Sequence, residues 1–221
     1  MNFKAFNIPV KISWTFWLFT LFTLFIGHSI TRQLPPAYTV IWGAALFASI
    51  LIHELGHALW YRWYGMVPKI EIHGMGGTTH GQGTKHLSMK EELVVTLAGP
   101  ISNLILAGLA FILLPIVKPM NIVPLTFFIS SSLYINLFLA VFNLIPVFPM
   151  DGGQALATLF KMKKGPAGAT MAYNVSGYLA IALAIITFMS GSMTIIPILF
   201  AYFAFISFSQ KKLAEQQQFY R

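Results

Sequence analysis

The sequence predicts an all-α integral membrane protein with six transmembrane helices and a small membrane-associated β-hairpin or re-entrant segment between the second and third helices. Three observations predict this fold class. First, 57% of the 221 residues are hydrophobic and only 9% are charged, which is far from the composition of a soluble domain. Second, several uncharged runs are long enough for a helix that spans a bilayer, which needs about 20 residues. Third, the basic residues collect on one side of these runs.

Uncharged runs locate the expected helices. No Asp, Glu, Lys or Arg interrupts the runs at residues 12–31, 33–53, 93–117 and 119–150. A longer run, 165–210, contains Ser190-Gly191-Ser192, which favours a turn between two helices. We therefore expect helices at residues 13–31, 38–63, 90–116, 121–145, 167–189 and 193–209. They should form a single transmembrane domain over residues 1–210, followed by a polar cytoplasmic tail at residues 211–221.

The basic residues predict the orientation in the membrane. Of the 14 Lys and Arg residues, only Arg32 and Lys118 fall on the opposite side from the rest once six helices are assumed. Because basic residues in short loops stay in the cytoplasm, we expect a multi-pass protein of the cell membrane with both termini cytoplasmic. Anionic lipid head groups account for the net charge of +8, so membrane lipid is an expected partner and nucleic acid is not.

The segment His53-Glu54-Leu55-Gly56-His57 places three ionisable groups in an expected transmembrane helix. One helical turn separates His53 from His57, so both imidazoles project from one face and can bind Zn²⁺, while Glu54 can deprotonate water nearby. A carboxylate in a membrane segment is costly without a cation. The alternative is a histidine pair whose hydrogen bonds are satisfied inside the helical bundle.

Asp151 is the candidate for a third zinc ligand, because a catalytic zinc usually has three protein ligands. It is the single aspartate of the chain and follows the expected fourth helix. The expected topology puts it at a depth similar to that of His53 and His57, near the cytoplasmic face. Alternatively, Asp151 is the N-cap of a following helix.

Together the two motifs resemble the site-2 protease family of intramembrane zinc metalloproteases. Its HExxH element is matched at residues 53–57, and its Asn- and Pro-rich element is matched by Asn143, Pro146, Pro149, Asp151 and Gly152. The segment Gly99-Pro100-Ile101-Ser102-Asn103 is similar to a helix-packing element of the family. The resemblance implies one Zn²⁺ per chain bound by His53, His57 and Asp151, with Glu54 as general base. It also implies that Asn143 stabilises charge on the scissile carbonyl oxygen, although an interhelical amide is the alternative for Asn143.

The resemblance implies an intramembrane zinc endopeptidase, active in regulated intramembrane proteolysis, that cuts a peptide bond within or near the transmembrane segment of a membrane protein. The active site is expected near the cytoplasmic side, with a single-pass transmembrane protein or a signal peptide as substrate. We expect a minimal form without a PDZ or CBS domain, in which lipid, a regulatory membrane protein or movement of the first, fifth and sixth helices controls access. Two alternatives are a membrane metal transporter and a non-catalytic relative that binds transmembrane segments.

Residues 68–83 are expected to form the β-hairpin. Ile70 and Ile72 alternate with polar residues, and the glycines that follow allow a tight turn. An unwound substrate would add to an exposed edge of this hairpin, so the predicted substrate-binding residues are Ile70, Ile72, Gly74 and Gly76. The segment Ile8-Pro9-Val10-Lys11-Ile12 alternates in the same way and can add a strand. An ordinary loop on the membrane surface is the alternative, and the loop histidines His73, His80 and His86 are expected to be solvated.

Overall fold

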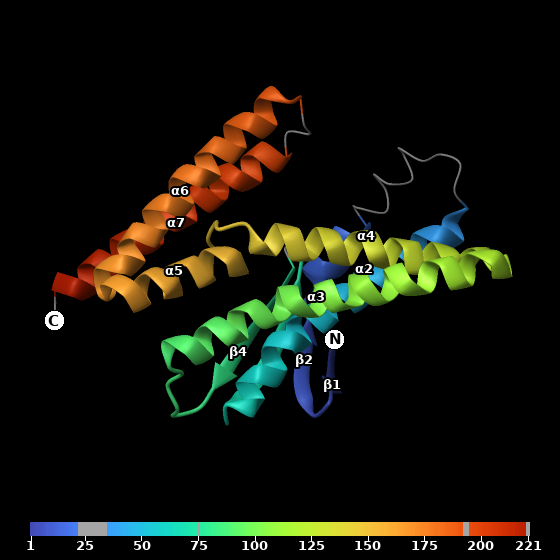
Figure 1. The fold of residues 1–221 in the computed structure, drawn as a ribbon, viewed down its shortest axis with the longest axis horizontal. Coiled ribbons are helices and arrows are strands. Elements are labelled where there is room, and N and C mark those ends of the chain that lie inside the picture. Colours follow the sequence, from blue (N-terminus) through green and yellow to red (C-terminus); the bar gives the residue numbers. More distant parts are fainter. Residues whose placement is uncertain (22–34, 75, 192–194, 220–221) are drawn as a thin grey trace. The chain divides into compact units, whose positions relative to one another are not determined.

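The computed structural model describes residues 1–21, 35–74, 76–191 and 195–219 (Figure 1). Its elements are, in chain order, β1 (Asn2–Ala5), β2 (Ile8–Ile12), α2 (Pro36–Trp63), β3 (Val67–His73), β4 (Gly76–Gln82), α3 (Met89–Val117), the 3-10 helix η1 (Lys118–Met120), α4 (Val123–Leu144), α5 (Asp151–Lys164), α6 (Pro166–Met189) and α7 (Ile195–Phe219). Residues 14–21 are also helical, and the remainder of the helix predicted at 13–31 lies outside the described residues.

The chain divides into two compact units. The first contains Met1–His86 and Ala98–Ala140, and the second contains Leu87–Leu97 and Val141–Arg221. The first unit therefore holds the whole sheet, α2 and most of α3 and α4, whereas the second holds α5, α6 and α7. Each unit has its own apolar cluster.

Four of the described helices are long and apolar enough to cross a membrane: Ala37–Trp63, Met89–Met120, Val123–Leu144 and Pro166–Met189. The first of these is the most enclosed, since 44% of its most apolar window is buried against 28%, 22% and 22% for the others. α7 continues through Lys211 and Lys212 into a polar C-terminal half. The chain is thus a mostly helical protein with at least these four candidate spans and a small sheet.

The sheet is larger than the predicted hairpin. Its four strands lie in the order β1-β2-β3-β4, with β2 parallel to β3 and the other two pairs antiparallel. The predicted strand at residues 8–12 pairs with β3 through Val10–Ile70 and Ile12–Ile72. The predicted all-α class is corrected in this respect, because β1 and β2 extend the hairpin into a sheet that packs against α2 (Figure 1).

Alternating side chains explain how the sheet packs. Ile8, Val10 and Ile12 are buried on one face of β2, whereas Pro9 and Lys11 are exposed. Ile70 and Ile72 are fully buried in the same cluster, which includes Leu46, Ile50, Leu55 and Ala58 of α2. Burial of this apolar face is the main force that holds the sheet on the helix.

Glu71 lies on the opposite face of β3, between two lysines. Its Oε1 lies 2.8 Å from Lys69 Nζ and 3.7 Å from Lys11 Nζ. The hydrogen bond from Lys69, and then the charge of Lys11, lower the pKa of the Glu71 carboxyl below its ordinary value. This polar cluster shows that one face of the sheet is solvated.

The second unit contains a helix that the sequence did not predict. α5 (Asp151–Lys164) lies between the helices predicted at residues 121–145 and 167–189, where a helix was considered only in the alternative role of Asp151 as an N-cap. Gly152 and Gly153 are poor helix formers. The glycines have a packing reason: a Cβ at Gly152 would overlap the carbonyl oxygens of Leu144 and Ile145. Gly165, at φ 63°, ends α5, and α6 begins at Pro166.

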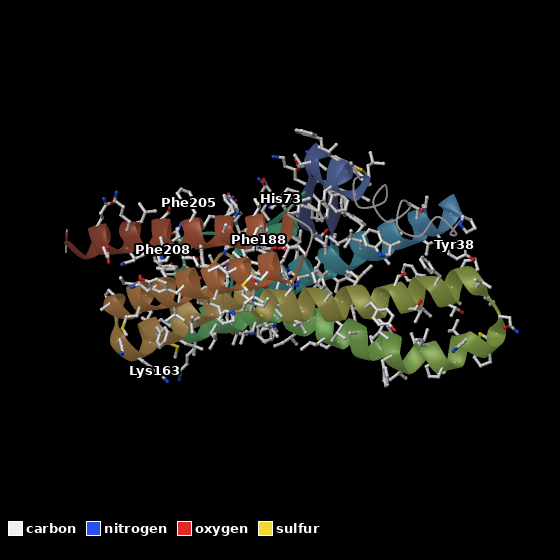
Figure 2. The ribbon with its side chains drawn as sticks, turned by 90° about the horizontal axis from the view of Figure 1, so that it is seen from above. Tyr38, His73, Lys163, Phe188, Phe205 and Phe208 are labelled. Atoms are coloured by element: carbon white, nitrogen blue, oxygen red, sulfur yellow. The ribbon has the colours of Figure 1, made fainter. Side chains whose placement is uncertain are left out.

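α6 and α7 run side by side in the second unit (Figure 1). Phe208 points from α7 toward α6, where a Cβ at Gly177 would overlap its ring, whereas Phe205 stands on the outer face and is 68% exposed (Figure 2). Ser207 of α7 and Ser176 of α6 hydrogen-bond to each other at 2.8 Å. The same pair binds the backbone of Phe148, whose N–H donates to Ser176 Oγ at 2.6 Å and whose carbonyl accepts from Ser207 Oγ at 3.2 Å.

Candidate active site

The last third of α2 buries three ionisable side chains in succession. His53, Glu54 and His57 are 7%, 4% and 8% exposed. Helical spacing stacks His53 and His57 on one face, and their Nε2 atoms lie 3.2 Å apart. Two nitrogens of a tetrahedral zinc site, each about 2.0–2.1 Å from the metal, are separated by roughly 3.3 Å. The histidine pair therefore has the separation of two zinc ligands, and without metal one protonated Nε2 can donate to the other.

Asn103 of α3 fixes the tautomer of His53. Both protons of the Asn103 amide are used, one on Ser49 O at 3.2 Å and one on Asn136 Oδ1 at 2.7 Å. Its oxygen therefore faces His53 Nδ1, at 2.5 Å, and a carbonyl oxygen can only accept. Nδ1 consequently carries the proton, and the lone pair of His53 Nε2 is left for a metal.

Asn136 of α4 extends this polar network. Its amide donates to Ser49 Oγ at 2.9 Å and to Ser132 O at 2.8 Å. Asn103 and Asn136 are both fully enclosed, with exposed fractions of 0% and 1%. The network joins α2, α3 and α4 within the first unit, so the orientation of His53 depends on three helices.

Gly99 leaves room for an ion beside the histidines. It lies in α3, and a Cβ at this position would overlap the Nε2 atoms of both His53 and His57. The lack of a side chain at Gly99, the separation of the nitrogens and the tautomer of His53 all fit a zinc ion. The residues of the first unit thus satisfy the requirements for two of its ligands.

β4 holds the carboxylate of Glu54. Thr79 Oγ1 donates to Glu54 Oε2 at 2.6 Å and lies 3.2 Å from the Glu54 carbonyl oxygen. A Cβ at Gly77 would overlap the same carboxylate. A buried carboxylate needs such a donor, because burial without a hydrogen bond is costly.

Asn143 and Asp151 belong to the second unit. Asn143 lies in the last turn of α4 and is half-buried, and Asp151 is a buried residue in the first turn of α5. The N-cap of α5 is Met150, so Asp151 does not occupy the cap position that was its alternative role. A carboxylate in the first turn still interacts favourably with the helix dipole.

The predicted substrate-binding residues fall in different environments. The prediction that Ile70 and Ile72 bind substrate at an exposed edge is corrected. Their side chains are in the core, and the strand that carries them is paired on both sides. Gly74 packs against Thr15, whose hydroxyl accepts a hydrogen bond from the Gly74 N–H at 3.1 Å. Gly76 begins β4 at φ 123° with open space around its Cα. His73 hydrogen-bonds to Thr78 Oγ1 at 2.8 Å.

Sequence reasoning missed Thr79, Gly77, Asn136 and Ser49 at this site, and treated Asn103 only as a packing residue. A hydroxyl in a glycine-rich loop gives no local signal of a contact with α2. Polar residues within α4, an otherwise apolar helix, were the available hint for Asn136, since such groups need partners in a membrane.

Comparison with known proteins gives consistent matches. Residues 42–123 and 118–187 match the sequence model of peptidase family M50. A zinc metalloprotease of Methanocaldococcus jannaschii is 32% identical over 207 residues, which are 91% of this chain and 58% of that protein. Stage IV sporulation protein FB of Bacillus subtilis is 31% identical over 120 residues, 52% of this chain and 38% of that protein. This chain thus spans less than two thirds of the length of these curated relatives.

A solved structure has the same fold. The site-2 protease from Methanocaldococcus jannaschii superposes with a TM-score of 0.62 at 29% identity, over 96% of this chain and 94% of that chain. The match with the family model covers about two thirds of the sequence and includes the HExxH segment and the segment that ends in Asp151-Gly152. The chain therefore belongs to peptidase family M50, the site-2 protease family that its two motifs resemble.

Proposed function

We propose that this chain is an intramembrane zinc endopeptidase, which hydrolyses a peptide bond within or near the transmembrane segment of a membrane protein. One observation carries the proposal: His53 and His57 present Nε2 atoms 3.2 Å apart, next to a buried carboxylate, in a helix apolar enough to cross a membrane. Membership of peptidase family M50 and the zinc metalloproteases among its relatives support it.

His53 and His57 bind one Zn²⁺ per chain, and Asp151 is the third ligand. The spacing of the family pattern supports this role for Asp151, as does the burial of its side chain at the start of α5. When bound, zinc supplies a Lewis acid that polarises the scissile carbonyl and makes water more acidic. Glu54 takes a proton from water and later donates it to the leaving amine. Asn143 donates a hydrogen bond from its amide N–H to the oxygen of the scissile carbonyl as negative charge develops there.

The substrate is a single-pass transmembrane protein or a signal peptide that unwinds before it is cut. The peptide bonds of a helix are covered by its own hydrogen bonds, so an extended segment needs other partners. β4 offers them, because within the described residues no strand pairs with its outer edge. We therefore place substrate addition along β4, which includes Gly76, and not at Ile70 and Ile72 of the central strand.

The protein crosses the membrane six times as one catalytic domain over residues 1–210, with both termini and the active site on the cytoplasmic side. The distribution of its basic residues supports this orientation. α7 and the helix predicted at residues 13–31, of which residues 14–21 are described and helical, supply the two crossings beyond the four candidate spans. Membrane lipid surrounds the apolar helices, and a regulatory membrane protein is a further partner.

The proposal is tested with purified protein in proteoliposomes that contain a tagged single-pass substrate. Zinc-loaded wild type should cleave the substrate, whereas Glu54→Gln and a chelator-treated sample should not. Cleavage by Glu54→Gln at the wild-type rate contradicts the role of Glu54 as the general base. Zinc flux that survives Glu54→Gln without any cleavage supports a transporter instead, and substrate retention without cleavage supports a non-catalytic binding protein.

A further inference from the structure

The carboxylate of Glu54 is held by a different element from the one that carries it. Thr79, on β4, donates its hydroxyl proton to Glu54 Oε2 at 2.6 Å, the length of a hydrogen bond from a hydroxyl to a carboxylate. The same hydroxyl lies 3.2 Å from the Glu54 carbonyl oxygen. Since a hydroxyl has one proton, the shorter contact is the principal one.

Gly77 lies close to the other carboxylate oxygen of Glu54. A Cβ at Gly77 would overlap Glu54 Cγ and Oε1, so a side chain at this position would displace the carboxylate. Gly77 and Thr79 are two residues apart in β4 and therefore lie on the same face of the strand. One strand face thus provides both the hydrogen-bond donor and the space that Glu54 requires.

We propose that Thr79 is a positioning residue for the general base, acting through Glu54. This inference rests on the proposed function. The terminal torsion of a glutamate side chain is broad, so an unrestrained carboxylate samples many orientations. With Oε2 held by Thr79, the carboxylate plane is fixed and Oε1 is left to accept the proton of water. Gly77 permits this arrangement because it adds no side chain.

The position of Thr79 ties the general base to the sheet. Thr79 is the register partner of Ile70, which is fully buried in the core cluster of the first unit. Pairing with the packed strand β3 therefore fixes the position of Thr79, and the hydrogen bond from Thr79 fixes the orientation of the Glu54 carboxylate. β4 is also an edge strand, with no strand on its outer side in the described part of the chain.

A set of threonine variants tests the inference. Thr79→Val keeps the shape of the side chain and removes the donor, so kcat should fall by about 10- to 100-fold with KM unchanged. Thr79→Ser restores the hydroxyl and should recover kcat. Thr78→Val is the matched control for stability: it is the same substitution on the adjacent residue, whose hydroxyl bonds to His73 at 2.8 Å rather than to Glu54.

Zinc content and thermal unfolding supply readouts that do not depend on turnover. Thr79→Val should keep one zinc per chain. It should lower the unfolding midpoint more in the wild-type background than in Glu54→Ala, where the carboxylate is absent and only the backbone carbonyl of residue 54 remains as an acceptor. Thr78→Val should shift the midpoint equally in both backgrounds.

Four results overturn the inference: wild-type kcat in Thr79→Val, no recovery in Thr79→Ser, loss of zinc from Thr79→Val, or equal midpoint shifts for Thr79→Val in both backgrounds. Failure of the proposed function is distinguishable, because wild type itself would then show no cleavage. The unfolding comparison between Thr79 and Thr78 variants still decides whether Thr79 holds Glu54.

Discussion

Replacement of Asn103 by alanine should weaken zinc binding by reorienting His53. The Asn103 side chain makes three hydrogen bonds, with His53 Nδ1, Ser49 O and Asn136 Oδ1. Side-chain hydrogen bonds between membrane helices average about 0.6 kcal/mol, so their loss should cost roughly 2 kcal/mol of stability. Loss of the acceptor for Nδ1 also frees the imidazole to rotate or change tautomer, which should lower zinc affinity by about 10- to 100-fold.

Asn136→Ala is the matched control for this prediction. Asn136 also takes part in three side-chain hydrogen bonds, with Asn103, Ser49 Oγ and Ser132 O, but none of them reaches His53. Both variants should therefore lose similar stability in a detergent unfolding titration. Asn103→Ala should lose more zinc affinity than Asn136→Ala, measured by competition with a chromophoric chelator, because only Asn103 contacts His53 directly. Equal losses of affinity in the two variants, or none in Asn103→Ala, would refute the orienting role of Asn103.

Three further predictions concern other parts of the molecule. Gly99→Ala should abolish zinc binding in a metal analysis. Gly108→Ala, on the same helix with open space around it, should bind zinc normally. Equal zinc contents in the two variants would contradict the close approach of α3 to His53 and His57. Ser176→Ala removes the acceptor of the Phe148 N–H, so hydrogen exchange at that amide should accelerate, and an unchanged rate would count against the contact. Because neighbouring lysines lower the pKa of Glu71, its charge stabilises the fold above the ordinary value of 4.5, and this contribution is lost as the pH falls through the lowered value. Glu71 is partly exposed, so Glu71→Gln should cost less than about 1 kcal/mol at neutral pH, and the unfolding midpoints should converge in acid; divergence in acid would contradict the sign.

Local periodicity was enough to predict the core of the site. His53 and His57 share a helix face because the helical repeat fixes the positions of residues i and i+4, whatever surrounds them. The same reasoning with a period of two correctly predicted strands at residues 8–12 and 68–83, since alternating isoleucines need one buried face. The resemblance to a family pattern is the basis for proposing that Asp151 is the third zinc ligand.

Features that depend on tertiary packing could not be predicted in this way. α5 has two glycines in its first turn, which propensity disfavours, and they allow the helix to pack on the end of α4. Ile70 and Ile72 were expected at a substrate edge, but β2 pairs with the edge that a simple hairpin would have left open. The alternation at residues 8–12 predicted that this segment could add a strand, but it did not indicate which edge of the hairpin the strand would pair with.

The supports of the catalytic groups were hidden for a related reason. Thr79 and Gly77 lie in a glycine-rich strand without regular alternation. Both contact Glu54 of α2, which lies 25 residues before Thr79 in the chain. Asn103 and Asn136 come from two other helices. The chemistry of a site can thus be read from its motif, whereas the residues that orient it follow from how the elements pack.

Hydrolysis in water labelled with oxygen-18, followed by mass spectrometry of the products, tests the central claim most directly. Zinc-loaded wild type should cut a single-pass substrate within or near its transmembrane segment. The new carboxyl terminus should carry one labelled oxygen, and Glu54→Gln should give no such product. A cut far outside the transmembrane segment, or the same labelled product from Glu54→Gln, would contradict an intramembrane peptidase that uses Glu54 as its base.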